Sequence, residues 1–369
     1  MRESHVDDGA QTLTQLTTPA VVIDLDKVGR NIRRHQDYAD RHGLKLRPHI
    51  KTHKLPQIAA MQLRAGAIGV TCQKVSEAEA MVAGTPEIKD VLITYNIIGA
   101  EKLDRLAALA KKVRLSVVAD NETVIASLSQ RFATEAAPLA VLVECDTGAH
   151  RCGVATPEDA AALAQVIAKS PGLTFGGLMT YPPPDGAAAV QAFMTRAKSL
   201  IEARGIVVPV ITSGGTPSMA KAGDAPVTTE YRAGTYVYND RSLVARGACG
   251  WDDCALTVLA TVVSVPAPNR AIIDAGSKAL TSDLLGLPDY GHILGRDDIR
   301  IDQLSEEHGR LVSESPIGLK VGDRVRIVPN HACVVSNLVD QVYVTAADGT
   351  NAAGKTWDVW PVVARGRIS

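Results

Sequence analysis

Short apolar runs alternate with longer amphipathic stretches through the first two thirds of the chain. Eight of these runs are rich in β-branched residues and are predicted strands. They cover residues 44–51, 67–72, 90–95, 114–120, 139–146, 173–181, 208–214 and 227–238. Between them, apolar residues recur at helical spacing and predict helices, for example over residues 77–83, 100–112, 122–136, 157–170 and 188–204.

Repeated strand–helix units favour a parallel sheet with helical cover, because right-handed crossovers leave few other ways to bury such strands. Eight units in roughly 200 residues match a closed (β/α)8 TIM barrel, which we expect over residues 25–240. An open doubly wound sheet stays possible on the pattern alone. Polar residues at the predicted carboxyl ends of strands, such as Lys51, Glu144 and Tyr181, favour the barrel, because barrel active sites collect there.

The pattern changes after residue 240. Helical periodicity stops, and short alternating runs with turn residues between them predict an antiparallel β-domain over residues 241–369. An early strand over residues 18–24 has no helix before it, so we expect it to join this second domain.

Composition narrows the function. The 369 residues carry 39 Lys and Arg against 40 Asp and Glu, and this balance argues against a nucleic-acid partner or a membrane surface. No apolar run reaches the ~18 residues of a membrane span, and Arg2, Glu3, Asp7 and Asp8 occupy the place of a secretory signal. We therefore expect a cytoplasmic protein whose six dispersed cysteines are reduced.

The densest group of cations and imidazoles is RPHIKTHK at residues 47–54. In an extended strand, Arg47, His49 and Lys51 would project to one face, at the mouth of the barrel. Crowding beside other cations lowers the pKa of an amine, which makes Lys51 a Schiff-base candidate. A solvated basic turn would look the same in sequence.

Two glycine-containing segments follow the last two predicted barrel strands, where barrels commonly bind phosphate. These are SGGT, with Ser213, Gly214, Gly215 and Thr216, and GTY, with Gly234, Thr235 and Tyr236. Alone, SGGT is usually a turn. Opposite a candidate Schiff-base lysine, it indicates an anchor for a phosphorylated aldehyde such as pyridoxal phosphate.

A third candidate site lies in the second domain, where His331 and Cys333 are two residues apart. On a strand they would face the same way and offer an imidazole and a thiolate to Zn²⁺ or a similar divalent ion. A buried histidine beside an inert cysteine is the alternative. No serine triad, P-loop or dinucleotide-binding fingerprint is present.

Taken together, the motifs resemble the D-threonine aldolase and D-serine dehydratase family, whose members are fold-type III pyridoxal-phosphate enzymes with an alanine-racemase-like barrel and a β-domain. The resemblance runs in consistent order along nearly the whole chain. The motifs are TPAVVIDLD (18–26), RPHIKTHK (47–54), CQKVSEAE (72–79), DTGAHRCGV (146–154), SGGT (213–216), DAGSKA (274–279), SEEHG (305–309) and PNHAC (329–333).

The resemblance implies roles for individual residues. Lys51 would carry the cofactor, Arg151 would lie near its phenolic oxygen, and Tyr181 would meet its pyridine nitrogen. The phosphate would bind Ser213, Gly214, Gly215, Thr216, Gly234 and Thr235, with Tyr236 adjacent. His331 and Cys333 would hold a divalent metal (Zn, Mn or Mg) that binds the substrate's β-hydroxyl. Members are typically homodimers.

Two outcomes fit such a site. Removal of the hydroxyl proton breaks the Cα–Cβ bond of a β-hydroxy-D-amino acid and gives glycine and an aldehyde, whereas removal of the Cα proton gives a 2-oxoacid and ammonia. Length, the compact loop after Tyr181 and the Asn-His-Ala-Cys motif resemble sequences commonly assigned as D-threonine aldolases. Two features differ from the well-known aldolases: Cys333 is typical of the D-serine and 3-hydroxy-D-aspartate dehydratases, and residues 182–186 lack the histidines that those aldolases carry after this tyrosine. We favour the aldolase, with His49 or His53 as the hydroxyl base. A non-catalytic cofactor carrier and a racemase are the weaker alternatives.

Overall fold

The computed structural model describes residues 13–345 and 356–369, so the charged residues Arg2, Glu3, Asp7 and Asp8 lie outside the described part. Two compact units are present, and the division falls within helix α1 (Leu25–Arg41). One unit comprises Ile32–Tyr236 with Gly366–Ser369, and the other comprises Met1–Asn31 with Val237–Arg365. None of the helices in the described part combines the length and apolar character needed to cross a membrane.

The first unit contains the predicted barrel. Its eight parallel strands follow the order β2-β9-β8-β7-β6-β5-β4-β3. The strands are β2 (Lys45–Leu46), β3 (Val70–Cys72), β4 (Asp90–Ile93), β5 (Arg114–Ala119), β6 (Leu139–Cys145), β7 (Leu173–Thr180), β8 (Ile211–Ser213) and β9 (Glu230–Tyr231). They are shorter than the apolar runs that predicted them, because one or both ends of each run lie outside the strand.

Backbone contacts join the two end strands of this sheet. The amide of Ile68 donates to Leu46 O at 3.0 Å, that of Thr71 donates to Pro48 O at 2.8 Å, and His49 forms a parallel bridge with Thr71. The sheet therefore closes on itself, which confirms the barrel and excludes the open sheet.

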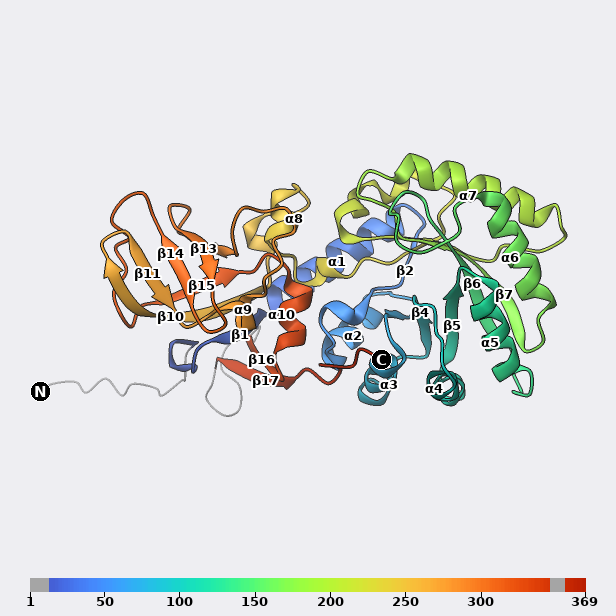
Figure 1. Ribbon diagram of the computed structural model, residues 1–369, viewed down its shortest axis with the longest axis horizontal. Coiled ribbons are helices and arrows are strands. Elements are labelled where there is room, and N and C mark those ends of the chain that lie inside the picture. Colours follow the sequence, from blue (N-terminus) through green and yellow to red (C-terminus); the bar gives the residue numbers. More distant parts are fainter. Residues whose placement is uncertain (1–12, 346–355) are drawn as a thin grey trace, which may run out of the picture. The chain divides into compact units, whose positions relative to one another are not determined.

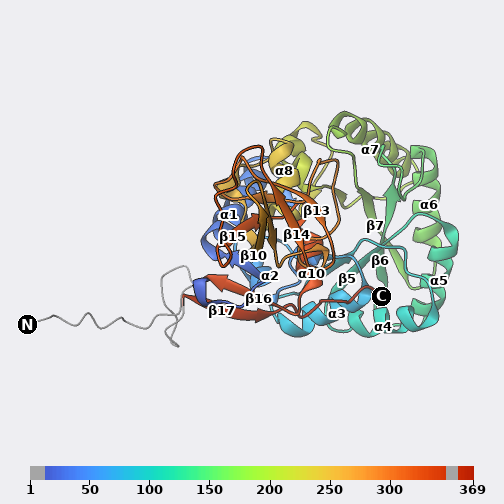
Figure 2. The ribbon, with the colours of Figure 1, turned by 60° about the vertical axis from the view of Figure 1, so that its left-hand side comes forward.

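Helices cover the outside of the barrel strands, as Figure 1 and the rotated view of Figure 2 show for β4 to β7. They are α2 (Pro56–Arg64), α3 (Val75–Gly84), α4 (Ala100–Ala110), α5 (Glu122–Phe132), α6 (Pro157–Lys169) and α7 (Ala187–Glu202), followed by the 3-10 helix η3 (Thr216–Asp224). At the start of α6, Thr156 Oγ1 accepts the amide of Asp159 at 3.1 Å, and Pro157 occupies the first turn. Such signals, read from neighbouring residues, determine where this helix of the strand–helix repeat begins.

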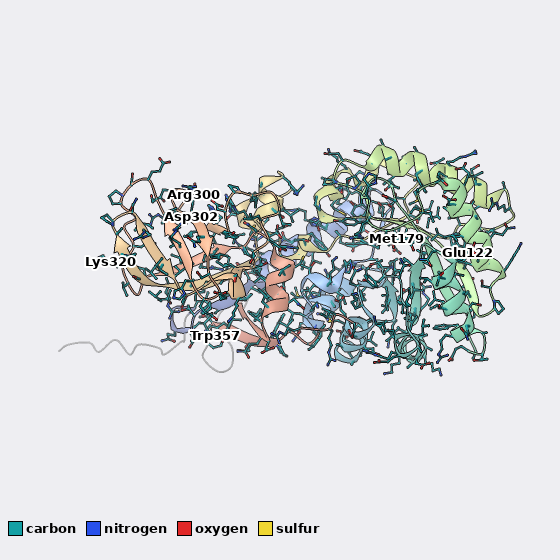
Figure 3. The ribbon with its side chains drawn as sticks, in the orientation of Figure 1. Glu122, Met179, Arg300, Asp302, Lys320 and Trp357 are labelled. Atoms are coloured by element: carbon teal, nitrogen blue, oxygen red, sulfur yellow. The ribbon has the colours of Figure 1, made fainter. Side chains whose placement is uncertain are left out.

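The barrel core rests on aliphatic side chains, as the scarcity of aromatic residues requires. Leu92, Val118, Leu142 and Met179 form one buried cluster with a residue from each of four neighbouring strands. Met179 is labelled among these strands in Figure 3. Such a layer of interdigitating side chains fills the barrel and leaves the chemistry to the residues at its mouth.

The second unit is built on a nine-stranded mixed sheet in the order β13-β14-β11-β10-β1-β16-β17, with β15 joining β10 to β12. Its strands are β1 (Ala20–Asp24), β10 (Leu256–Ala267), β11 (Arg270–Ile273), β12 (His292–Ile293), β13 (Arg300–Leu304), β14 (Gly309–Val312), β15 (Arg324–Val328), β16 (Gln341–Thr345) and β17 (Trp357–Pro361). The early strand is part of this sheet, because β1 pairs with β10 and β16.

Two details of the β-domain differ from the prediction. The sheet is not wholly antiparallel, since β1 runs parallel to β16. Helical structure also continues after residue 240, in α8 (Arg241–Ala245), α9 (Ser277–Leu280) and α10 (Ala332–Leu338). These helices are too short to leave a periodic apolar pattern. The hydrophobic core includes Trp357, labelled in Figure 3, which packs edge-on against Tyr343 at a ring distance of 5.3 Å.

Candidate active site

Lys51 lies on a 3-10 turn, η2 (Ile50–Thr52), directly after the first barrel strand. The prediction that it belongs to an extended strand is therefore wrong. The strand ends at His49, whose amide donates to Ala233 O at 2.9 Å, and the amides of His53 and Lys54 then close the turn onto Ile50 O. The half-buried Lys51 still stands at the carboxyl end of β2, which is the mouth of the barrel.

His49, directly before this turn, is buried and lies near several positive charges. Its Nε2 lies 3.0 Å from Oε1 of Gln73, whose own amide nitrogen donates to Thr94 O at 2.8 Å. The proton of the neutral ring therefore belongs on Nε2, and Nδ1 is buried without a partner among the described residues. Burial, and then the charge of Lys51, lower the pKa of His49 well below its ordinary value, with further contributions from Arg232 and Arg151.

The charges around His49 indicate the charge of the molecule that the site binds. Three cations, Lys51, Arg232 and Arg151, lie close enough to one imidazole to disfavour its protonation. Such a cluster attracts an anionic molecule. The residues present therefore fit a cofactor with an anionic ring and a phosphate, such as pyridoxal phosphate.

His53 and Lys54, in contrast, belong to the barrel core. Nδ1 of the fully buried His53 accepts the amide of Leu55 at 3.0 Å, and Nε2 lies 3.2 Å from Oε1 of Gln62. Burial lowers the pKa of His53 to about 4. Lys54 Nζ is ion-paired at 3.7 Å with the buried carboxylate of Glu77. The structure thus brings Lys51 and His49 to the mouth and leaves His53 and Lys54 within the wall.

The two predicted phosphate segments are tied to each other. Oγ1 of Thr216 accepts the amides of Gly234 at 3.3 Å and Tyr236 at 3.1 Å, while Thr235 lies between them. Tyr236 itself is buried, and its hydroxyl accepts the side-chain amide of Gln62 at 2.9 Å. One hydroxyl therefore holds the loops after β8 and β9 together.

Close backbone approaches explain the glycines of these loops. A Cβ on Gly214, at a φ of +143°, would lie 2.6 Å from the amide nitrogen of Arg232. A Cβ on Gly234 would lie 2.9 Å from His49 O and 3.0 Å from Thr52 Oγ1. The GTY segment therefore packs directly against the turn that carries Lys51, so lysine and glycine loops form one site.

Arg151 and Tyr181 enter the site from the loops after β6 and β7. The Arg151 guanidinium lies 4.6 Å from the centre of the Tyr181 ring, in a cation–π contact. The same ring would lie 3.3 Å from a Cβ on Gly215, so Tyr181 also borders the SGGT loop that begins with the buried Ser213. Arg151 and Tyr181 thus border the SGGT loop, whereas the other predicted base, His53, lies in the barrel core.

Two buried charges of the site, Arg232 and Glu144, were assigned no chemical role from the sequence. Nε of Arg232 donates to Thr212 Oγ1 at 2.9 Å, and burial lowers the pKa of Arg232 to about 10. Burial raises the pKa of Glu144 to about 7, although the nearby Arg151 and Arg232 oppose that rise. Glu144 is recognisable in sequence as a carboxylate closing an apolar strand, but nothing in the sequence pairs it with Arg232.

His331 and Cys333 lie in the other unit, and the prediction that they occupy a strand is wrong. His331 precedes α10 and Cys333 is its second residue, because Oδ2 of the buried Asp240 accepts the first helical amide, that of Ala332, at 3.1 Å. The His331 imidazole nevertheless contacts the Cys333 thiol.

A carboxylate that the sequence did not reveal orients this imidazole. Nδ1 of His331 lies 2.7 Å from Oδ2 of Asp283, which leaves Nε2 for a ligand. Within residues 13–345 and 356–369, no cluster of three or more metal-ligating side chains occurs. A carboxylate-supported His–Cys pair fits a metal site whose remaining positions are taken by water or substrate.

Comparisons with known proteins agree with this geometry. Residues 23–242 match the family described as "Alanine racemase, N-terminal domain", and residues 255–345 match "Putative serine dehydratase domain". A D-threonine aldolase from Arthrobacter sp. is 37% identical over 96% of this chain and 94% of its own length. A 3-hydroxy-D-aspartate aldolase from Paracoccus denitrificans is 36% identical over 96% of this chain and 93% of its own.

A solved structure extends the match to three dimensions. The D-threonine aldolase from Filomicrobium marinum superimposes with a TM-score of 0.88 at 34% identity, over 97% of this chain and 98% of its own. Fold, motif order and relatives over nearly the full length all point the same way. The chain therefore belongs to the D-threonine aldolase and D-serine dehydratase family.

Proposed function

We propose that this chain is a pyridoxal-phosphate- and divalent-metal-dependent D-threonine aldolase of low specificity, a lyase that cleaves β-hydroxy-D-amino acids to glycine and an aldehyde. The observation that carries the proposal is the meeting of Lys51, the two glycine loops and the Arg151–Tyr181 pair at one barrel mouth. The most similar full-length relatives reported above are named as aldolases.

Different residues would bind different parts of the cofactor. Lys51 Nζ is the amine for its aldehyde carbon. The loops that Thr216 joins, with Ser213, Gly214, Gly215, Gly234, Thr235 and Tyr236, would receive its phosphate. Arg151 and Tyr181 would border its ring. When bound, pyridoxal phosphate supplies an electron sink for the charge that develops at Cα.

His331 and Cys333 would hold the divalent ion, which supplies Lewis acidity toward the substrate's β-hydroxyl. Asp283 would fix the imidazole so that Nε2 faces the ion. Zn, Mn and Mg remain the candidates, and a thiolate ligand favours Zn among them.

His49 suits the acceptance of the hydroxyl proton better than His53 does. Its Nδ1 carries a lone pair that no described residue uses, whereas both ring nitrogens of His53 are engaged in the core. Nearby cations lower the pKa of His49, and an anionic group bound among them would relieve that effect. We therefore assign the role of base to His49.

The second candidate function is a D-serine or 3-hydroxy-D-aspartate dehydratase, which gives a 2-oxoacid and ammonia. Cys333 as the second metal ligand favours it, as does the serine dehydratase family match over the β-domain. A product assay with D-threonine separates the two. The aldolase gives acetaldehyde and glycine, whereas 2-oxobutyrate and ammonia would establish the dehydratase. A homodimer is the proposed assembly, to be checked by analytical ultracentrifugation.

A further inference from the structure

Asn330 stands directly before His331 in the PNHAC motif, and none of the roles proposed above uses its side chain. The residue is 2% exposed. Its side-chain nitrogen donates to Asp289 O at 2.7 Å and to Asp283 O at 3.2 Å. One buried amide therefore binds both ends of the segment 283–289, from the position next to a proposed metal ligand.

The segment 283–289 depends on such bonds for its shape. It lies between α9 and β12 and consists of turns and bends. Leu285 has a positive φ of 50°, and Thr281, just before the segment, has a φ of 66°. Positive φ is unfavourable for residues that carry a Cβ, so contacts from the surrounding structure must hold the chain in this conformation. Asn330 supplies two of those contacts.

Arg241 determines which way the Asn330 amide points. Nη1 of Arg241 donates to Asn330 Oδ1 at 3.3 Å and to Asp289 O at 3.2 Å, and it is ion-paired with the Asp289 carboxylate. A guanidinium group can only donate hydrogen bonds, so the amide oxygen must face it. The amide nitrogen is thereby directed to the two backbone carbonyls.

Two consecutive residues bind the same aspartate. His331 Nδ1 lies 2.7 Å from the Asp283 carboxylate, while Asn330 binds the backbone carbonyl of Asp283. The first contact orients the imidazole, and the second fixes the backbone from which the carboxylate extends. Without the Asn330 amide, the carboxylate is free to move away from His331.

We propose that Asn330 is a positioning residue of the metal site, which holds Asp283 against His331 and thereby raises the affinity for the divalent ion. The inference rests on the proposed function, since it takes His331 and Cys333 as the metal ligands. It deepens that function by naming a residue that acts on a ligand through another residue. All of these residues belong to the same structural unit.

A purely structural role is the competing explanation, because any buried amide that binds two carbonyls stabilises the fold. Asn31 provides the matched control. It is 1% exposed, belongs to the same unit, and its side-chain nitrogen donates to Val237 O at 3.3 Å and to Asp253 O at 2.8 Å. Asn31→Ala thus also removes two bonds from a buried amide to backbone carbonyls, but it leaves Asp283 untouched.

The test measures the zinc affinity of the pyridoxal-phosphate holoenzyme by competition with a chelator of known affinity. Asn330→Ala should lower this affinity about tenfold, as expected when the support of a metal-binding histidine is lost. Asn31→Ala should lower it by less than about twofold, although both variants should melt at a lower temperature than the wild type. Asn330→Ser, whose shorter side chain cannot reach both carbonyls, takes its place if Asn330→Ala does not fold.

A double variant tests whether Asn330 acts through Asp283. Asp283→Asn removes the carboxylate that Asn330 is proposed to hold in place. Adding Asn330→Ala to Asp283→Asn should therefore lower the zinc affinity by less than about a further twofold, because two residues that act as one unit are not additive. The visible absorbance of the cofactor should be the same in all these variants.

Three results would overturn the inference: an unchanged zinc affinity in Asn330→Ala, an equal loss in Asn31→Ala, or a full additional loss in the double variant. If the wild-type protein binds no divalent ion, the metal part of the proposed function fails on its own. Hydrogen exchange of residues 283–289 then decides whether Asn330 positions Asp283. Faster exchange in Asn330→Ala than in the wild type and Asn31→Ala supports this role, and equal exchange refutes it.

Discussion

Nε2 of His53 lies 3.2 Å from Oε1 of Gln62, and the amide nitrogen of that glutamine donates to the buried hydroxyl of Tyr236 at 2.9 Å. The three side chains form a hydrogen-bonded chain from the turn after Lys51 to the loop after β9. Their burial makes each link costly to break, at ~1–3 kcal/mol for an unpaired group. The chain therefore supports the site from beneath, while His53 keeps no nitrogen for catalysis.

His53 should make the protein sensitive to acid. Its ordinary pKa is 6.5, but burial lowers it to about 4 in the folded protein, so the unfolded chain binds the proton first. The free energy of unfolding should fall as pH drops from about 6.5 to about 4, by roughly 3 kcal/mol in all. Urea unfolding at several pH values should show this slope in the wild type and a reduced slope in His53→Gln. His308→Gln, at an exposed histidine, should keep the slope; an unchanged slope in His53→Gln would contradict the assignment.

Lys51→Ala should abolish the visible absorbance of the cofactor and the activity, because it removes the proposed amine. Lys54→Ala should retain the absorbance but lose about 3 kcal/mol of stability, since the buried Glu77 carboxylate loses its partner at 3.7 Å. Absorbance spectra and thermal melts of the two variants measure both effects. Absorbance that survives in Lys51→Ala would move the attachment to Lys54, Lys74 or Lys278.

Glu144 should make the cofactor-free protein less stable as the pH rises from acid to neutral. Burial raises its pKa from 4.5 to about 7, so between these values the folded protein holds a proton that the unfolded chain has lost. The free energy of unfolding should therefore decrease as pH rises from about 4.5 to 7, by up to about 3 kcal/mol. Glu144→Gln should be more stable than the wild type at pH 8 and lose this advantage near pH 4.5 in denaturant titrations. A difference independent of pH would refute the explanation.

Asp283→Asn should weaken the binding of the divalent metal by about 10- to 100-fold, because it removes the carboxylate that orients His331. Activity measured against added metal should shift to higher concentration, while cofactor absorbance stays unchanged. Chelation by EDTA should likewise remove activity and leave the cofactor bound. Full turnover in EDTA would exclude His331 and Cys333 from the reaction.

The barrel was predictable because the sequence signals for its strands and helices lie within short segments. Each apolar run and each helix start, such as that at Thr156, can be read within a dozen residues. The β-domain was less predictable: strands β12 to β14 and helix α10 are short, and β1 finds its partners far along the sequence.

The site residues likewise fall into those that the sequence reveals and those that it does not. Lys51, the glycine loops and the His331–Cys333 pair stand in compact motifs that resemble a family. Asp283 lies 48 residues before the histidine it orients, and Arg232 meets Thr212 only because β8 and β9 are neighbours in the barrel. Such pairings arise from tertiary packing, and no spacing in the sequence encodes them.

The position of strand β1 in the sequence has a consequence for folding during synthesis on the ribosome. Strand β1 is synthesised before every barrel strand, yet it pairs with β10 and with β16, which begins at Gln341. Every strand of the barrel is synthesised after β1 and before β10 and β16. The barrel can therefore fold while β1 has no strand to pair with. Completion of the second sheet must come last, and a nascent chain stalled before Gln341 would present an unprotected edge to chaperones and to other chains.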